Sequence, residues 1–226
     1  MQKLLALVIF AALSGLLYAD DGLLSATVGP SGIGVSEVDG PENRSFKFVD
    51  AKTHHILGDL GLDDLSNVSV YASWNKSGTR VAILVYYGTK LSELCIYEVE
   101  ANQKIRQVKF DQPDPIAVYE ATSKSKFRYA NNTGSDSSDI GAWKNDNTVE
   151  LVSGATKEID DKDSTLTGTV SLFVAFEVHV QDAKIQVSIG KLTGPIQDNE
   201  NGDKGDAFLE NWEKQNGITN GAMSGN

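Results

Sequence analysis

The fold is decided by residues 68–110, VSVYASWNKSGTRVAILVYYGTKLSELCIYEVEANQKIRQVKF. Residues 80–87, RVAILVYY, are apolar at almost every position, which predicts a central strand covered on both faces. A cluster of turn formers precedes this strand, with Trp74 to anchor the turn on the core. Residues 94–100 and 105–110 predict two further strands, the second more polar and typical of a sheet edge. The stretch therefore predicts a meander of short antiparallel strands.

The chain has a single cysteine, Cys95, in the middle of this stretch. One cysteine excludes an internal disulfide, so the core rather than a crosslink must stabilise the fold. Strand periodicity places Cys95, Tyr97 and Val99 on one apolar face. We expect Cys95 to be a buried, unreactive thiol, because free cysteine is among the most buried residue types.

Partial copies of the meander lie on both sides of it. Residues 49–52 (VDAK) align with residues 99–102 (VEAN) at an offset of 50 residues. A period of this size is typical of repeat architectures such as propellers. On the other side, residues 141–152 (GAWKNDNTVELV) repeat the pattern of Trp, loop and strand. There Asn147 takes the place of Gly78, since Asn tolerates the left-handed conformation.

Residues 68–110 resemble one repeat of the TolB-type and WD-repeat β-propellers. A Trp-x-x-x-Gly loop leads into an apolar strand, and Ser77 stands where these repeats carry an Asp. Residues 46–57 and 141–192 match the repeat in part. The resemblance implies an all-β fold of antiparallel meanders, arranged as propeller-like blades. Three units are fewer than the four that close a propeller, so a small or incomplete propeller and a β-sandwich both remain open.

The most regular strand pattern follows the third unit. Residues 171–180 place an apolar side chain at every second position, from Leu172 to Val180, and residues 185–189 continue this apolar face after a turn. Glu177 and His179 share the opposite face. Alternation alone predicts polar residues there, so we interpret this pair as a polar sheet surface rather than an acid–base site.

Residues 111–140 are the longest polar interruption of the chain. Two prolines open it, and Ser, Asn, Asp and Lys follow. We expect a short hairpin from residues 118–120 and 126–129, with residues 131–139 as an exposed loop.

Residues 1–19 have the features of a signal peptide, namely a basic start, a short apolar run and a small residue before the cleavage point. An uncleaved anchor is the alternative. We therefore expect a secreted or periplasmic protein, with one all-β domain over residues 20–194 and an acidic, Gly-rich tail over residues 195–226. Asn75 begins one of four Asn-x-Ser/Thr sequons, which matter if the host glycosylates such sites.

The chain of 226 residues has a formal net charge of −11. Such a charge repels nucleic acid and anionic membrane surfaces, so we expect neither as a partner once the signal peptide is cleaved. It favours solubility and, weakly, the binding of cations.

The tail concentrates acidic residues between Asn and Gly, and these are the candidate calcium ligands: Asp198, Glu200, Asp203 and Asp206. Oxygen-rich loops suit Ca²⁺, but the EF-hand spacing is not met, and a flexible acidic linker is the alternative. We expect Asp206 to cap a short helix over residues 207–215. The helix would dock on the sheet through its apolar residues, which are Phe208, Leu209 and Trp212.

The sequence contains no phosphate-binding loop, nucleophile elbow or His-rich metal motif. The leading hypothesis is a secreted or periplasmic, non-catalytic protein that binds a protein or a carbohydrate, as the resemblance to interaction platforms implies. The competing hypothesis is a carboxylate-based hydrolase or lyase acting on carbohydrate, assisted by Ca²⁺ and built from residues 160–163 and 198–206. It requires these loops to converge on one pocket. A third is an exported domain whose role lies in an unknown partner.

Overall fold

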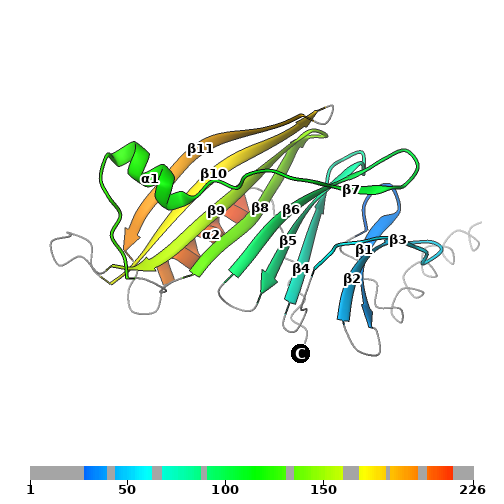
Figure 1. The fold of residues 1–226 in the computed structure, drawn as a ribbon, viewed down its shortest axis with the longest axis horizontal. Coiled ribbons are helices and arrows are strands. Elements are labelled where there is room, and N and C mark those ends of the chain that lie inside the picture. The colour runs from blue at the N-terminus through cyan, green and yellow to red at the C-terminus, as the bar shows by residue number, and fades with distance from the viewer. Residues whose placement is uncertain are drawn as a thin grey trace, which may run out of the picture.

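The computed structural model describes residues 28–39, 44–62, 68–87, 91–130, 135–159, 168–181, 184–197 and 203–215. Within these ranges the chain is all-β with two helices, as the sequence predicted (Figure 1). The elements are β1 (Ile33–Asp39), β2 (Arg44–Asp50), β3 (Ile56–Asp59), β4 (Val68–Trp74), β5 (Arg80–Tyr87), β6 (Leu91–Val99), β7 (Ile105–Val108), α1 (Pro115–Ser123), β8 (Ser135–Asn145), β9 (Thr148–Glu158), β10 (Thr169–Gln181), β11 (Lys184–Gln197) and α2 (Asp203–Gln215).

The strands form three consecutive antiparallel meanders. The first, β1–β2–β3, is a separate sheet. The second runs from β4 to β7 and the third from β8 to β11, and each strand pairs with the next along the chain. A single parallel bridge between Leu91 and Asp136 joins the second and third meanders into one larger sheet. The prediction of antiparallel meanders is therefore confirmed.

The second meander lies between the other two, and β5 is buried on both faces. Val81, Ile83 and Val85 pack into one apolar cluster with the first meander. Ala82 and Leu84 pack into a second cluster with β8, β9 and β10 of the third meander. All five side chains are at most 2% exposed. Full burial of an aliphatic side chain stabilises a fold by about 1.5–3 kcal/mol, so this strand carries much of the hydrophobic stabilisation.

Two turns share one geometry, the turn before β1 and the turn before β5. The β8–β9 turn differs, because Asn147, predicted to take the left-handed conformation of Gly78, does not have a positive φ. The turn before β1 has a hydrogen bond from Gly32 N to Gly29 O of 2.9 Å, and the turn before β5 has the equivalent bond from Gly78 N to Asn75 O, 3.1 Å long. Both Gly32 and Gly78 have positive φ, at 77° and 69°. The aligned segments around residues 50 and 100 likewise close β2 and β6 before the next turn. The sequence offset of 50 residues thus corresponds to equivalent strand ends in the fold.

Helix α1 replaces the hairpin that the sequence predicted over residues 118–129. Its N-cap is Asp114, whose carboxylate accepts a hydrogen bond from Ile116 N, and Pro115 occupies the first turn. Both are standard helix-start signals, and they prevail here over the polar composition of the segment. Residues 135–139, predicted to be loop, belong to β8, because they pair with β9.

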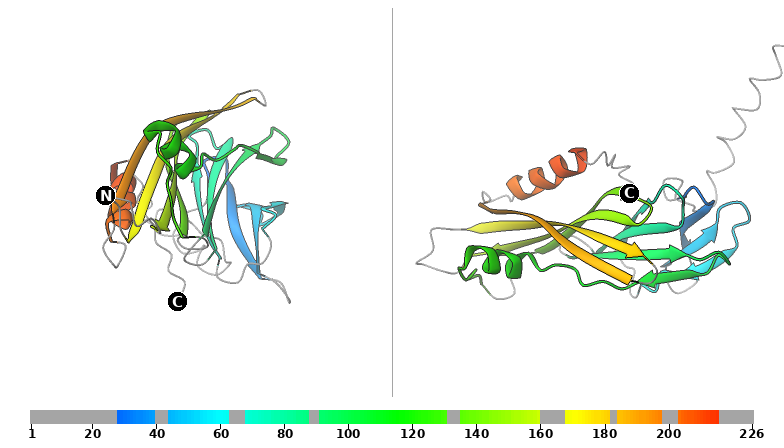
Figure 2. Two further views of the ribbon diagram at one scale, coloured as in Figure 1. Left: turned by 60° about the vertical axis from the view of Figure 1, so that its left-hand side comes forward. Right: turned by 90° about the horizontal axis from the view of Figure 1, so that it is seen from above.

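Helices α1 and α2 cover opposite faces of the third meander, as the right panel of Figure 2 shows. α1 packs with Phe127 against Leu172 on one face. α2 begins at Asp203 rather than at residue 207, so the prediction of an N-cap at Asp206 is wrong. Its docking residues are as predicted, since Trp212 is 8% exposed and Phe208 stacks on Phe173 with ring centroids 4.5 Å apart.

Candidate functional site

The predicted calcium ligands are not brought into a described site. Asp198 and Glu200 lie outside the described residues, as does the acidic loop at residues 160–163. Asp203 and Asp206 lie in the first turns of α2, but their side chains are also outside what the structure describes. Among the described side chains, no group of three or more His, Cys, Asp or Glu could hold a metal ion. Calcium binding by the tail stays a prediction.

Glu177 and His179 are engaged in surface contacts on the sheet. Lys144 Nζ donates to Glu177 Oε1, and this hydrogen bond is the main cause that raises the pKa of Lys144 above its usual value. His179 Nδ1 shares a hydrogen bond of 2.8 Å with Thr148 Oγ1, and its Nε2 lies 3.3 Å from Gln181 Oε1. The interpretation of a polar sheet surface fits these contacts better than an acid–base pair.

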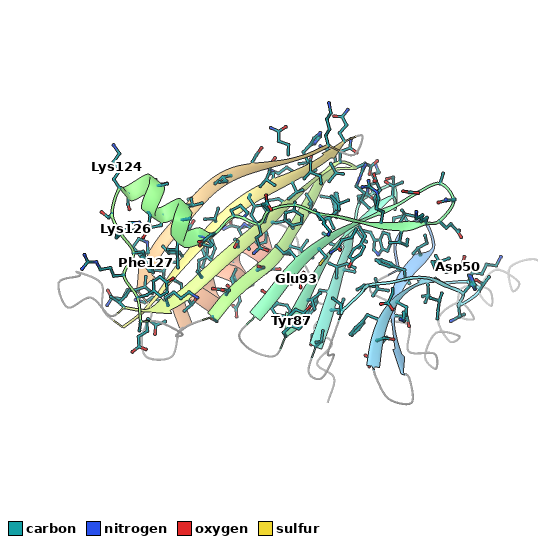
Figure 3. The ribbon with its side chains drawn as sticks, in the orientation of Figure 1. Asp50, Tyr87, Glu93, Lys124, Lys126 and Phe127 are labelled. Atoms are coloured by element: carbon teal, nitrogen blue, oxygen red, sulfur yellow. The ribbon has the colours of Figure 1, made fainter. Side chains whose placement is uncertain are left out.

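Cys95 is 3% exposed and packs in the cluster between the first two meanders. Burial, and then the nearby charge of Glu93, raise the pKa of its thiol to about 11. Glu93 accepts a hydrogen bond from Tyr87 at the ends of β5 and β6, where Figure 3 labels both residues. A thiol with so high a pKa is almost entirely protonated at neutral pH and is a poor nucleophile. The prediction of a buried Cys95 is confirmed.

A buried polar network joins the β4–β5 turn to the β8–β9 turn. Asn75 is 0% exposed, its Nδ2 donates to Asp146 O at 2.9 Å, and its Oδ1 accepts from Arg80 N at 3.0 Å. Arg80 Nη1 donates to the same Asp146 carbonyl at 2.8 Å, and Nη2 donates to Glu98 Oε1 at 2.7 Å. These hydrogen bonds are all internal to the protein, although the buried Nε of Arg80 has no hydrogen-bond partner in the described structure. We assign the network to stability rather than to ligand binding.

The burial of Asn75 also shows whether its sequon can carry a glycan in the folded protein. The side-chain amide of Asn75 is enclosed and its hydrogen bonds are internal. An attached glycan has no room at this nitrogen in the folded protein. Asn75 is therefore not a glycosylation site of the native fold.

Strand β11 forms the most exposed long edge of the described fold. It has 14 residues and is the last strand of the larger sheet (Figure 1). Within the described ranges its one strand neighbour is β10. Ile185 is 37% exposed and Ile189 is 56% exposed, whereas Val187 between them is half-buried. The strands that end the first two meanders, β3 and β7, have only four residues each.

The edge of β11 is regular in its first half only. Ile185, Val187 and Ile189 lie opposite Val180, Val178 and Phe176 without interruption. The register then shifts twice, once at residues 190–191 and once at residues 194–195. Gly190 permits the first shift, because a Cβ there would lie 2.9 Å from the carbonyl oxygen of Ala175. The second half of the strand contains the residues that protect an edge from pairing, which are Gly190, Lys191, Gly194 and Pro195.

Bulges, Lys and Pro are the means by which proteins protect an edge strand against unintended pairing. β11 applies them to residues 190–197 and leaves residues 184–189 regular. The sequence predicted the correct face for residues 185–189, and the register confirms it. It did not predict that two isoleucines on that face would be exposed. The signal that could have revealed an edge strand is the run of Gly, Lys and Pro that follows them.

Comparison with protein-family models, curated proteins and solved structures finds no match for this chain. Neither helix that the structure describes is long and apolar enough to cross a bilayer. Function is therefore inferred from the chain's own residues, and the β11 edge is the candidate functional surface.

Proposed function

We propose that the protein is a secreted or periplasmic, non-catalytic binding protein that accepts an extended segment of a protein along β11. The observation that carries this proposal is the regular edge at residues 184–189, where Ile185 and Ile189 are exposed. An open edge presents main-chain donors and acceptors, and an added strand satisfies them. Alternate side chains of the edge then contact alternate side chains of the partner strand.

The rest of the fold supports a binding role for this edge. A long, regular edge with exposed isoleucines is an aggregation hazard that proteins normally remove. Of the other strands at an edge, β3 and β7 have four residues and β1 and β4 have seven, and the second half of β11 is interrupted. Residues 184–189 of the longest edge strand stay regular, which favours a partner strand at this position.

The geometry shared by the turns before β1 and β5 is the observation that supports the relation to propeller-type interaction repeats that the sequence suggested. The competing hydrolase or lyase would depend on residues 160–163 and 198–206. No contact among the described side chains favours it, and it stays the alternative that a Ca²⁺-dependent activity on carbohydrate would establish.

The test is selection of random twelve-residue peptides by phage display. The target is the chain without residues 1–19, immobilised at low surface density. We expect strand-forming peptides to be enriched and to bind with a Kd on the order of 10⁻⁶–10⁻⁵ M by calorimetry. Ile189→Lys should weaken them by at least about tenfold, because it places a charge against the added strand.

The matched control is Ile56→Lys on β3, an equally exposed isoleucine at 50%. It should leave peptide affinity unchanged. The proposal is overturned if no peptide is enriched, or if the enriched peptides bind Ile189→Lys as tightly as the unmodified chain.

A further inference from the structure

We infer that the strand which pairs with β11 is β11 of a second copy, antiparallel to it and related by a two-fold axis at Val187. The inference rests on the proposed function, in that residues 184–189 accept a strand. It identifies the partner as the chain itself and predicts a closed dimer.

The residue pattern of the edge is symmetric about Val187. Residues 185–189 read Ile-Gln-Val-Ser-Ile, apolar at both ends and at the centre. Antiparallel pairing about Val187 places Ile185 opposite Ile189 of the second copy, and Val187 opposite its own equivalent. Directly opposite residues in an antiparallel pair lie on the same face, so the apolar side chains meet one another and the polar ones meet on the other face.

The register on β10 shows which face this is. Ile185, Val187 and Ile189 lie opposite Val180, Val178 and Phe176, and these three β10 residues are at most 1% exposed in the cluster between the second and third meanders. A second β11 would therefore extend the same apolar face outward. It would cover the two isoleucines that this cluster leaves exposed.

Charge favours the same register. The chain has a net charge of −11, which opposes self-association in general. Residues 184–190 nevertheless contain no acidic residue, and their one charged residue is Lys184. With the axis at Val187, Lys184 lies opposite Gly190 of the second copy, so no like charges face each other. Moving the axis one residue on, to Ser188, would place Ile185 opposite Lys191 and lose this match.

The bulge at residues 190–191 limits the new pairing to about seven residues a strand. An interface in which the same patch faces itself closes on forming a dimer and does not propagate into a fibre. So short an interface is at the weak end of specific associations, and we expect a dimer Kd on the order of 10⁻⁶–10⁻⁴ M.

Cysteine crosslinking tests the axis directly. In the proposed register the Cα atoms of the two Val187 residues are about 4.5–5.5 Å apart, within the range of a disulfide. Under mild oxidation Val187→Cys should give a covalent dimer. Ile185→Cys should not, because its two copies are four residues out of register, or roughly 13 Å apart. The unmodified chain is the control for Cys95, which is 3% exposed.

Charged substitutions at the two isoleucines provide a second test. Light scattering measures the mass of the species in solution at chain concentrations of about 10⁻⁶–10⁻³ M. Ile185→Lys alone and Ile189→Glu alone should each weaken the dimer by at least about tenfold. The double variant should restore it, because each lysine then faces a glutamate of the other copy.

A chain that stays monomeric at millimolar concentration, or a Val187→Cys variant that crosslinks no faster than Ile185→Cys, overturns the inference. The peptide selection separates this failure from failure of the proposed function. If peptides still require Ile189, the edge binds a strand from another protein and only the second copy is excluded. If they do not, the binding role of the edge fails as well.

Discussion

Replacing Asn75 by Ala tests the idea that one buried amide joins the second and third meanders. Its Nδ2 donates to Thr79 Oγ1 at 3.1 Å and to Asp146 O at 2.9 Å. Its Oδ1 accepts from Arg80 N at 3.0 Å. The substitution removes all three hydrogen bonds from a site that is 0% exposed.

The magnitude follows from what each partner loses. A typical internal hydrogen bond contributes about 1 kcal/mol net, which sets roughly 3 kcal/mol for three bonds. Asp146 O keeps its bond from Arg80 Nη1, and Thr79 keeps its contact with Ser77, so part of this loss is recovered. The Arg80 N–H loses the side-chain acceptor that it uses, which costs more than an average bond. We expect a net destabilisation of about 2–3 kcal/mol.

The assay is urea denaturation followed by circular dichroism, with a melting curve beside it. At this chain length about 2–3 kcal/mol corresponds to a fall in Tm of roughly 5–10 °C. The matched control is Asn102→Ala, which removes a single exposed hydrogen bond, Lys104 N to Asn102 Oδ1 at 3.0 Å. It should cost under about 1 kcal/mol. Equal effects of the two substitutions, or a cost under about 0.5 kcal/mol at Asn75, would refute the reasoning.

Three further predictions concern other parts of the fold. Burial would raise the pKa of Glu98, but hydrogen bonds from Arg106 and Arg80 outweigh burial and lower this pKa. The native chain should therefore be more stable than Glu98→Gln at pH 7 and should lose this advantage below about pH 4. Urea denaturation at the two pH values measures the difference. Cys95 should react with a thiol reagent only in denaturant, and rapid labelling of the native chain would contradict its burial. Trp212→Ala should undock α2 and speed amide exchange there by at least about tenfold, leaving β5 protected; equal change in both would mean global unfolding instead.

Local patterns predicted a large part of the fold because their causes are local. The apolar run at residues 80–87 predicts a strand that is buried on both faces, and β5 packs into an apolar cluster on each face. The spacing of Phe208, Leu209 and Trp212 selects one face of a helix, and that face docks on the sheet. Helix α1 begins at residues that cap and start helices, Asp114 and Pro115, and this local signal prevails over the polar composition that favoured a loop.

The sequence by itself determined the strand periodicity and the face on which the apolar residues of a strand lie, since both follow from spacing along the chain. Only the tertiary structure decided which of these residues are exposed and which distant groups meet. Asn75 and Asp146 are 71 residues apart in sequence and hydrogen-bond because two turns lie side by side. Ile185 and Ile189 have the pattern of buried residues and are exposed because β11 is the edge of its sheet. Position at an edge depends on which strands pair, and alternation within one strand carries no information about that.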